Sequence, residues 1–449
     1  MSISVVVNPR SDFLALVLIS AVSGLIILGP VIRSELGPLS DLSLFASFLV
    51  VLSGLFLRVF PPKNMLPLIV ISLLLASIAA LNALLVAQTI NGEVIRTVGR
   101  PLKGLLVLFS IYLVVELARR LLGNKRDPEQ IYDLFVRIIF GALTFQAVLI
   151  AVQFVYPPLG QFTHAVLFSE REILAHNMAN RMPGLAGAGG APLSALQGIG
   201  FLLGCYLCLK SHRPWLYVVP CALLIISVIL TGRTGMLVVF ASCVVTFAMI
   251  AQSRNARTPR SLLKMLGFFV GPVVLVWVYF SLAGISQNVQ WILQRSVEDI
   301  VNTATVAVTS GEIENSTIDE LSKMLILPES PVQMLIGDAR LFVNIKNGQI
   351  LYPSDIGYIR IWFAYGVIGV IMHVFFYLWM GFESVGRRPI NLIRSRSALL
   401  GASVVAAMLI LNYKEPFFFT RMVFPVTVFL AMAPAWLGLF DRSSASTDS

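Results

Sequence analysis

Two apolar runs separated by a very short turn decide the class of this protein. Residues 215–252 read WLYVVPCALLIISVIL, then TGRTG, then MLVVFASCVVTFAMIAQ. Each run approaches the roughly 20 apolar residues that a helix needs to cross the hydrocarbon core of a bilayer. The turn between them, Thr231 to Gly235, is too short to hold an element of its own. The stretch therefore predicts two closely spaced membrane helices.

The composition extends this interpretation to the whole chain. Hydrophobic residues make up 57% of the 449 residues and charged residues only 12%, against about 25% charged residues in soluble proteins. A surface with so few charges has to be covered by lipid. Runs like the two above recur along the chain, and we interpret twelve of them as helices. They span approximately 13–32, 42–60, 65–88, 104–118, 131–155, 193–209, 215–230, 234–252, 266–285, 355–382, 398–413 and 422–440.

We therefore expect an all-α polytopic membrane protein with about twelve transmembrane helices in a single domain, residues 1–449. The first run is longer than the apolar region of a cleaved signal peptide, so it should remain as the first helix. Two connections are long, about 156–192 and 286–353. In the second, Thr317 to Glu320 has the pattern of a capping box, and Ser330-Pro331 followed by Gly337 predicts another short helix.

The basic residues predict the orientation of the chain. The net charge is +10, and the Lys and Arg residues fall mainly in short loops, for example at Arg119, Arg120, Arg387 and Arg388. Short loops rich in Lys and Arg stay on the cytoplasmic side. This places both termini in the cytoplasm of a bacterial inner membrane and both long loops in the periplasm. The same distribution explains the positive charge without a nucleic-acid partner.

No metal or cofactor is expected from the pattern of potential ligands. The cysteines all lie inside apolar runs and are interpreted as packing residues: Cys205, Cys208, Cys221 and Cys243. His164 and His176 lack metal-ligand spacing, and His373 stands alone in a helix, where packing is the simpler interpretation. Asp133 and Arg137 are spaced to form an ion pair on one helix face.

The first candidate site is Arg233 in the TGRTG turn. The two glycines allow a tight backbone with exposed N–H groups, and an arginine beside such groups suits a phosphate. The simpler alternative is an arginine that only extends to the membrane interface.

The second candidate site lies where residues 352–360, YPSDIGYIR, enter the tenth helix. Ser354 is a natural N-cap, and Asp355 lies at the positive end of the helix, so Asp355 could simply be a cap. Asp355 and Tyr358 also share a helix face, and Arg360 lies about 8 Å further along the helix. An anionic ligand would explain an arginine at that depth.

The third and fourth candidate sites lie in loops. Residues 412–421 read NYKEPFFFTR, in which Lys414, Glu415 and Arg421 flank three aromatic residues. The simpler alternative is an aromatic belt at the membrane interface with a local ion pair. The fourth is Arg181, which precedes a glycine-rich segment that we interpret as tightly turned or re-entrant.

Four motifs give the chain a resemblance to a known family. They are LTGRTGML at 230–237, LIGDAR at 335–340, SDIGYIRI at 354–361 and KEPFF at 414–418. These resemble the Wzy-type O-antigen and capsular polysaccharide polymerases of the O-antigen ligase superfamily, which also have about twelve helices and two large periplasmic loops. The related ligases carry a histidine-rich motif where this chain has Ser354 to Tyr358, which favours a polymerase.

The resemblance implies a metal-independent glycosyltransferase. It would transfer a growing glycan from undecaprenyl diphosphate to a new lipid-linked repeat unit at the periplasmic face. Asp355 would be the base, with Tyr358 and Glu415 as further catalytic candidates. The expected ligands of the diphosphate are basic residues: Arg181, Arg233, Arg360, Lys414 and Arg421.

The implied partners are lipid-linked glycans and membrane lipids, and the resemblance leaves open a chain-length regulator and a flippase. An O-antigen ligase remains one alternative function. A transporter or flippase is an alternative of another class. Large facilitator transporters have a long cytoplasmic loop between their halves, whereas here only residues 210–214 join the sixth and seventh helices.

Overall fold

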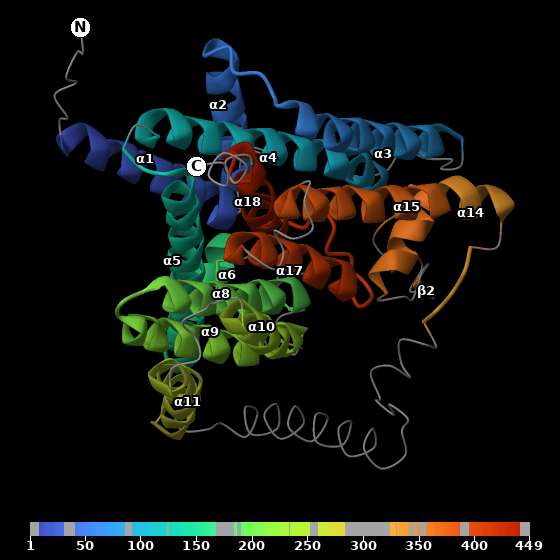
Figure 1. The fold of residues 1–449 in the computed structure, drawn as a ribbon. Helices are drawn as coiled ribbons and strands as arrows, with labels where there is room; N and C mark the ends of the chain where they lie inside the picture. Colours follow the sequence, from blue (N-terminus) through green and yellow to red (C-terminus); the bar gives the residue numbers. More distant parts are fainter. Residues whose placement is uncertain are drawn as a thin grey trace, which may run out of the picture.

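Helices account for almost all of the described chain (Figure 1). The computed structural model describes residues 9–30, 41–85, 92–123, 125–167, 184–185, 190–232, 234–251, 259–282, 324–328, 330–339, 341, 345–346, 349–350, 356–386 and 395–440. The α-helices are α1 (Pro9–Leu28), α2 (Leu42–Phe56), α3 (Leu66–Leu85), α4 (Gly92–Leu122), α5 (Pro128–Val155), α6 (Pro157–Leu167), α8 (Ala191–Lys210), α9 (Val218–Thr231), α10 (Thr234–Ala251), α11 (Pro259–Leu282), α14 (Pro331–Ile336), α15 (Gly357–Val385), α17 (Arg396–Leu411) and α18 (Val423–Trp436). Two short 3₁₀ helices are η2 (Lys63–Met65) and η3 (Pro214–Tyr217), and the strands β1 (Ile345–Lys346) and β2 (Gln349–Ile350) form a small antiparallel hairpin.

The lengths and composition of these helices indicate a polytopic membrane protein. Within the described residues, six helical segments are long and apolar enough to cross a membrane, and the remaining apolar helices include several of 10–17 residues. The six are Lys63–Leu85, Pro128–Val155, Ala191–Lys210, Pro214–Thr231, Thr234–Ala251 and Gly357–Val385. Each of the twelve predicted runs overlaps a helix, while the number of crossings stays a prediction.

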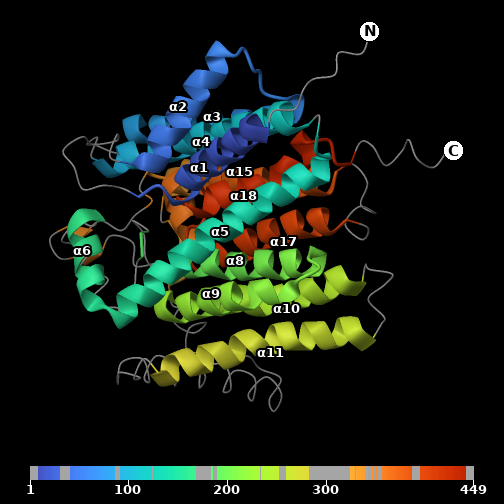
Figure 2. The same cartoon turned by 90° about the vertical axis from the view of Figure 1, so that its left-hand side faces the viewer.

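Large apolar side chains on the outer faces of the bundle fit a lipid surround. Phe240 of α10 is 74% exposed and Trp277 of α11 is 70% exposed. Figure 2 shows α8, α9 and α11 in successive layers, with α11 outermost. Exposed apolar surface on this scale is incompatible with water and marks contact with lipid or another protein.

Helix α8 packs at the centre of the group formed by α5, α9 and α10. In its most apolar 18-residue stretch, 89% of the residues are buried. Small residues let the neighbouring helices approach α8 closely, as is usual between membrane helices. A Cβ at Gly204 would overlap Cys221 of α9, and one at Gly198 would press on Val238 of α10. The predicted TGRTG hairpin, α9 and α10, therefore packs directly on α8. Cys205, Cys208 and Cys221 are buried here, as the packing interpretation predicted, whereas Cys243 of α10 is only partly buried.

Two predictions about individual helices need correction. The fourth helix begins at Gly92 rather than near 104, because its charged first turns are stabilised by contacts with distant parts of the chain. The tenth is interrupted at Gly366, where φ is 69°. By contrast, α14 begins after Ser330 with Pro331 at its first position and ends before Gly337, as predicted.

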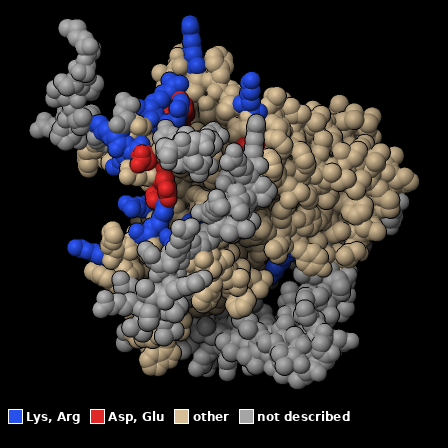
Figure 3. Space-filling model, viewed as in Figure 1, with Lys and Arg blue, Asp and Glu red and all other residues tan. Residues whose placement is uncertain are grey.

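Lys and Arg side chains gather at one end of the bundle, which we call the basic end. Figure 3 shows them on the left-hand side of the view, with the Asp and Glu residues among them. There Lys210, at the end of α8, forms ion pairs with Asp133 (2.8 Å) and Glu129 (2.7 Å) at the start of α5. The predicted pairing of Asp133 with Arg137 is therefore wrong, because α8 brings Lys210 to that carboxylate and Arg137 stays exposed.

Candidate functional site

The second and third candidate sites of the sequence form one site. The Tyr358 N–H at the start of α15 donates to the carbonyl of Asn412 (3.2 Å), and its hydroxyl donates to the carbonyl of Leu409 (2.6 Å). A Cβ at Gly357 would overlap the backbone of Glu415. Only glycine therefore allows the start of α15 to lie against the turn after α17. This contact brings Tyr358 and Arg360 to the turn that carries Lys414 and Glu415.

The turn itself, residues 412–422, is anchored by Asn412 and by its phenylalanines. The Asn412 side chain accepts from the Phe417 N–H and donates to the carbonyl of Met408, both at 2.8 Å. Phe417, Phe418 and Phe419 are 0%, 2% and 8% exposed. The alternative of an aromatic belt is therefore wrong, because a belt residue would be exposed at the membrane interface.

The backbone of this turn is strained. Phe419 has φ 52° and Met422 has φ 66°, a left-handed conformation that costs about 1–3 kcal/mol at a residue with a bulky side chain. Phe419 is held there by ring contacts with Phe376 (centroids 5.1 Å apart) and His373 (5.5 Å). Burial thus offsets the strain and fixes the course of the turn. His373 takes part in this packing through ring contacts with Phe418 and Phe419, and its Nδ1 lies 2.7 Å from the carbonyl of Gly369.

Arg100 of α4 belongs to the site and escaped the sequence analysis. Its Nη2 donates to the carbonyl of Pro416 (3.1 Å) and to the hydroxyl of Thr420 (3.0 Å). Arg360 of α15 lies three residues after Gly357, which contacts Glu415 of the same turn. The spacing of Arg96, Arg100 and Lys103 on one helix face was the available signal. It was missed because hydropathy excluded these residues from the predicted run.

Arg421 lies on the same turn but has a different set of contacts. Its Nη2 lies 3.4 Å from the carboxylate of Asp41 and also donates to the carbonyl of Gly29. Asp41 in turn caps α2 by accepting from the N–H groups of Ser43 (3.1 Å) and Leu44 (3.2 Å). Arg421 therefore joins the turn to the α1–α2 connection, which favours a structural role over the predicted contact with a ligand.

The break in α15 shapes the site from the other side. At Gly366 a Cβ would overlap the carbonyl of Leu335, so the glycine lets α14 and the following segment lie against α15. The freed carbonyls of Phe363 and Ala364 accept from the N–H groups of Asp338 (2.7 Å) and Ala339 (3.0 Å). Broken helices at membrane depth occur where the backbone is covered by protein or lines a polar site.

The same break places a second overlooked residue, Asp338, in the protein interior. Asp338 is 3% exposed, and it belongs to the LIGDAR motif that was quoted only for its resemblance. The Tyr365 hydroxyl donates to the carbonyl of Thr97 (2.7 Å), which connects this part of α15 to α4.

Three predicted site residues, Asp355, Arg181 and Arg233, lie outside the described residues, as does the predicted capping box at 317–320. The neighbours of Arg233 are described, and their geometry changes the earlier interpretation. The Gly232 N–H donates to the carbonyl of Val228 (3.0 Å), and the Gly235 N–H donates to the hydroxyl of Ser194 (2.9 Å). These two N–H groups are therefore engaged in packing and are not exposed for a phosphate.

The glycine-rich segment after Arg181 is anchored on α5 at Gly184 and Leu185. The Gly184 N–H donates to the side chain of Gln153 (3.1 Å), and the Leu185 N–H donates to that of Gln146 (3.2 Å). These two buried glutamines share a face of α5. They explain why an apolar helix carries amides, and they support the predicted tight turn.

Among the residues with described side chains, no group of His, Cys, Asp and Glu could hold a metal ion. No model of a protein family matches the chain. No curated protein matches it either. Arg100 and the start of α15, which carries Arg360, both lie against the 412–422 turn. Guanidinium groups placed in this way suit a ligand with several negative charges.

Proposed function

We propose that the protein is a polysaccharide polymerase of the kind that its motifs resemble. It transfers a glycan from undecaprenyl diphosphate to a second lipid-linked repeat unit at the periplasmic face of a bacterial inner membrane. In this proposal the basic end faces the cytoplasm, as expected for Lys- and Arg-rich short loops. About twelve helices cross the membrane, both termini are cytoplasmic, and the long loops are periplasmic.

The observation that carries the proposal is that Arg100 of α4 and the start of α15, which carries Arg360, both lie against the 412–422 turn. Guanidinium groups that reach one turn from two helices suit a bound diphosphate. Arg100 is held in place by Pro416 and Thr420, so little reorganisation is needed when negative charge develops during the reaction.

The proposed reaction is a glycosyl transfer. A hydroxyl oxygen of the acceptor sugar forms a bond to the anomeric carbon of the donor. The bond from that carbon to the phosphate oxygen breaks, and the lipid diphosphate leaves with the electron pair. Arg100 and Arg360 stabilise the charge on the leaving group, and a carboxylate takes the hydroxyl proton. Glu415 and Asp355 are the candidates for this base, and Lys414 is a further ligand of the glycan donor.

The experiment is deletion and complementation in the source bacterium, with surface and lipid-linked glycans separated by length. A polymerase deletion leaves single repeat units on the final acceptor. A ligase deletion instead accumulates lipid-linked polymer that is never transferred. A flippase deletion leaves lipid-linked repeat units on the cytoplasmic side. Only the first pattern, reversed by the wild-type gene, supports the proposal, and either of the others rejects it.

A further inference from the structure

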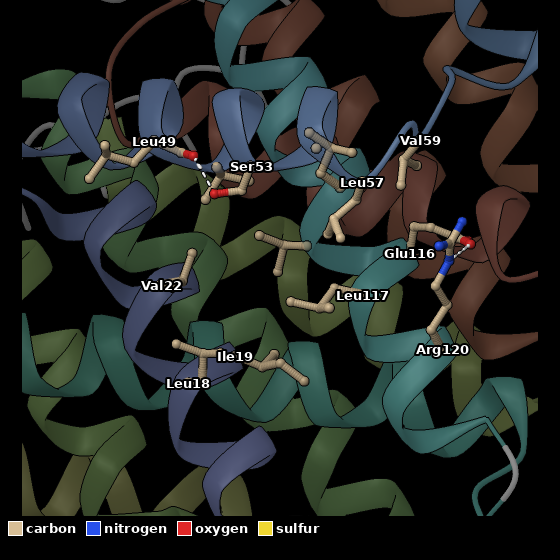
Figure 4. A pocket seen from close by; sticks show the side chains of 14 residues that line it. Leu18, Ile19, Val22, Leu49, Ser53, Leu57, Val59, Glu116, Leu117 and Arg120 are labelled. Atoms are coloured by element: carbon tan, nitrogen blue, oxygen red, sulfur yellow. Dashed lines mark hydrogen bonds and ion pairs between the residues drawn. The ribbon is translucent and has the colours of Figure 1, made fainter.

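An apolar groove lies between α1, α2 and α4, near the end of α4 that is remote from the candidate site (Figure 4). Its volume is about 330 Å³, within the roughly 300–1,000 Å³ of typical ligand sites. The walls are mainly Leu, Ile and Val side chains. Ser53 also lines the groove, but its hydroxyl donates to the carbonyl of Leu49 (2.8 Å), so it presents little polarity to a ligand.

The groove is open to the surroundings of the bundle. Leu18 of α1, Leu49 of α2 and Leu57 just after α2 line it and are 52%, 45% and 62% exposed. In a membrane these side chains face hydrocarbon. A Cβ at Gly54 would overlap the side chain of Leu113, so α2 and α4 are in direct contact where these two residues line the groove.

One end of the groove is positively charged. Figure 4 shows Glu116 and Arg120 together at that end, beside Val59. Glu116 accepts from both Arg119 (2.7 Å) and Arg120 (2.8 Å), which leaves one positive charge among the three groups. Both arginine side chains are 54% exposed, so their remaining donors can reach a ligand.

We propose that this groove binds an anionic phospholipid, with one acyl chain along the apolar walls and its phosphate at Arg120, the arginine that lines the groove. The apolar walls of the groove match the acyl chain of such a lipid, and the basic end matches its anionic headgroup. Basic side chains at the membrane surface attract anionic headgroups, and bidentate arginine contacts suit a phosphate. This site is separate from the candidate site at Arg100, sixteen residues before Glu116 along the same helix, or about 24 Å by the helical rise.

The proposal is tested by native mass spectrometry of the full-length protein with added lipid. Phosphatidylglycerol is compared with phosphatidylcholine of the same acyl chains. We expect wild-type protein to retain phosphatidylglycerol about fivefold better, since a basic residue near the membrane surface contributes about that factor. No preference would show that the groove accepts any lipid and would overturn the anionic assignment.

Two variants locate the binding. Ser53→Trp should fill the groove and reduce phosphatidylglycerol retention at least about fivefold. The matched control is Ser77→Trp on α3, where the serine is also exposed and its hydroxyl also donates to the carbonyl four residues earlier (2.8 Å). Arg120→Gln should remove the preference while keeping phosphatidylcholine binding. Equal retention by Ser53→Trp and Ser77→Trp, or an unchanged preference in Arg120→Gln, would contradict the proposal.

Discussion

The two ends of α4 each hold arginines in place, but with different kinds of partner. At the basic end a carboxylate, Glu116, attracts Arg119 and Arg120 and matches part of their charge. At the other end, Arg100 is oriented by the carbonyl of Pro416 and the hydroxyl of Thr420, on the turn that the start of α15 also contacts. The first arrangement pairs charges within one helix. The second fixes an arginine of α4 beside the helix start that carries Arg360, which is why we propose the anionic ligand there.

The largest effect should come from removing either arginine of the second pair. Arg100→Ala or Arg360→Ala should lower the rate of polymer formation roughly 10²–10³-fold, as loss of a fixed donor does in other enzymes. Arg100→Lys should recover only part of the rate, because lysine lacks the planar fork that reaches two acceptors. Rates are measured on membranes with equal amounts of folded protein.

Arg137→Ala is the matched control for these variants. Arg137 is an exposed arginine on α5 near the basic end, so its loss should leave the rate within about twofold, as for most exposed positions. If Arg100→Ala is as active as Arg137→Ala, Arg100 only ties α4 to the turn.

A smaller but still large effect is expected from Gly357→Ala. The added Cβ overlaps the backbone of Glu415, so α15 has to move away from the 412–422 turn. Displacements near 1 Å in a site can cost about 10²-fold in rate. The control is Gly141→Ala on α5, where a Cβ meets no atom within 4 Å. Equal polymer yields from the two glycine variants would show that polymer formation does not depend on the contact between α15 and the turn.

The smallest effect should follow Tyr358→Phe. In the wild-type protein the Tyr358 hydroxyl donates to the carbonyl of Leu409 (2.6 Å), a hydrogen bond worth about 1 kcal/mol of folding free energy. We expect a lower midpoint of thermal unfolding in detergent and a rate within about tenfold of wild type, since positioning is retained. A rate loss like that of Arg100→Ala, with unchanged stability, would instead make Tyr358 a catalytic residue.

The sequence predicted the helices well and the site only in pieces. Apolar runs mark helices because each run alone satisfies the requirement for burial in lipid. The first turns of α4 could not be found that way, since the acceptors of Arg100 lie 316 and 320 residues away in the chain. Residues 352–360 and 412–421 were predicted as two separate sites for the same reason. In the structure, the contact of Gly357 with Glu415 joins them into one site. Asp355, Arg181 and Arg233 stay predictions.

The most direct test of the arginine pair is the binding of a polyprenyl diphosphate to the purified protein, measured by titration in detergent. The matched ligand is the monophosphate of the same lipid, and the matched variant is again Arg137→Ala. We expect wild-type protein and Arg137→Ala to bind the diphosphate equally and more tightly than the monophosphate. Arg100→Ala and Arg360→Ala should each weaken diphosphate binding about tenfold or more, the effect of losing a charged hydrogen bond. Equal affinity of all four proteins for the diphosphate would contradict the account, because the arginines would then have no anion to hold.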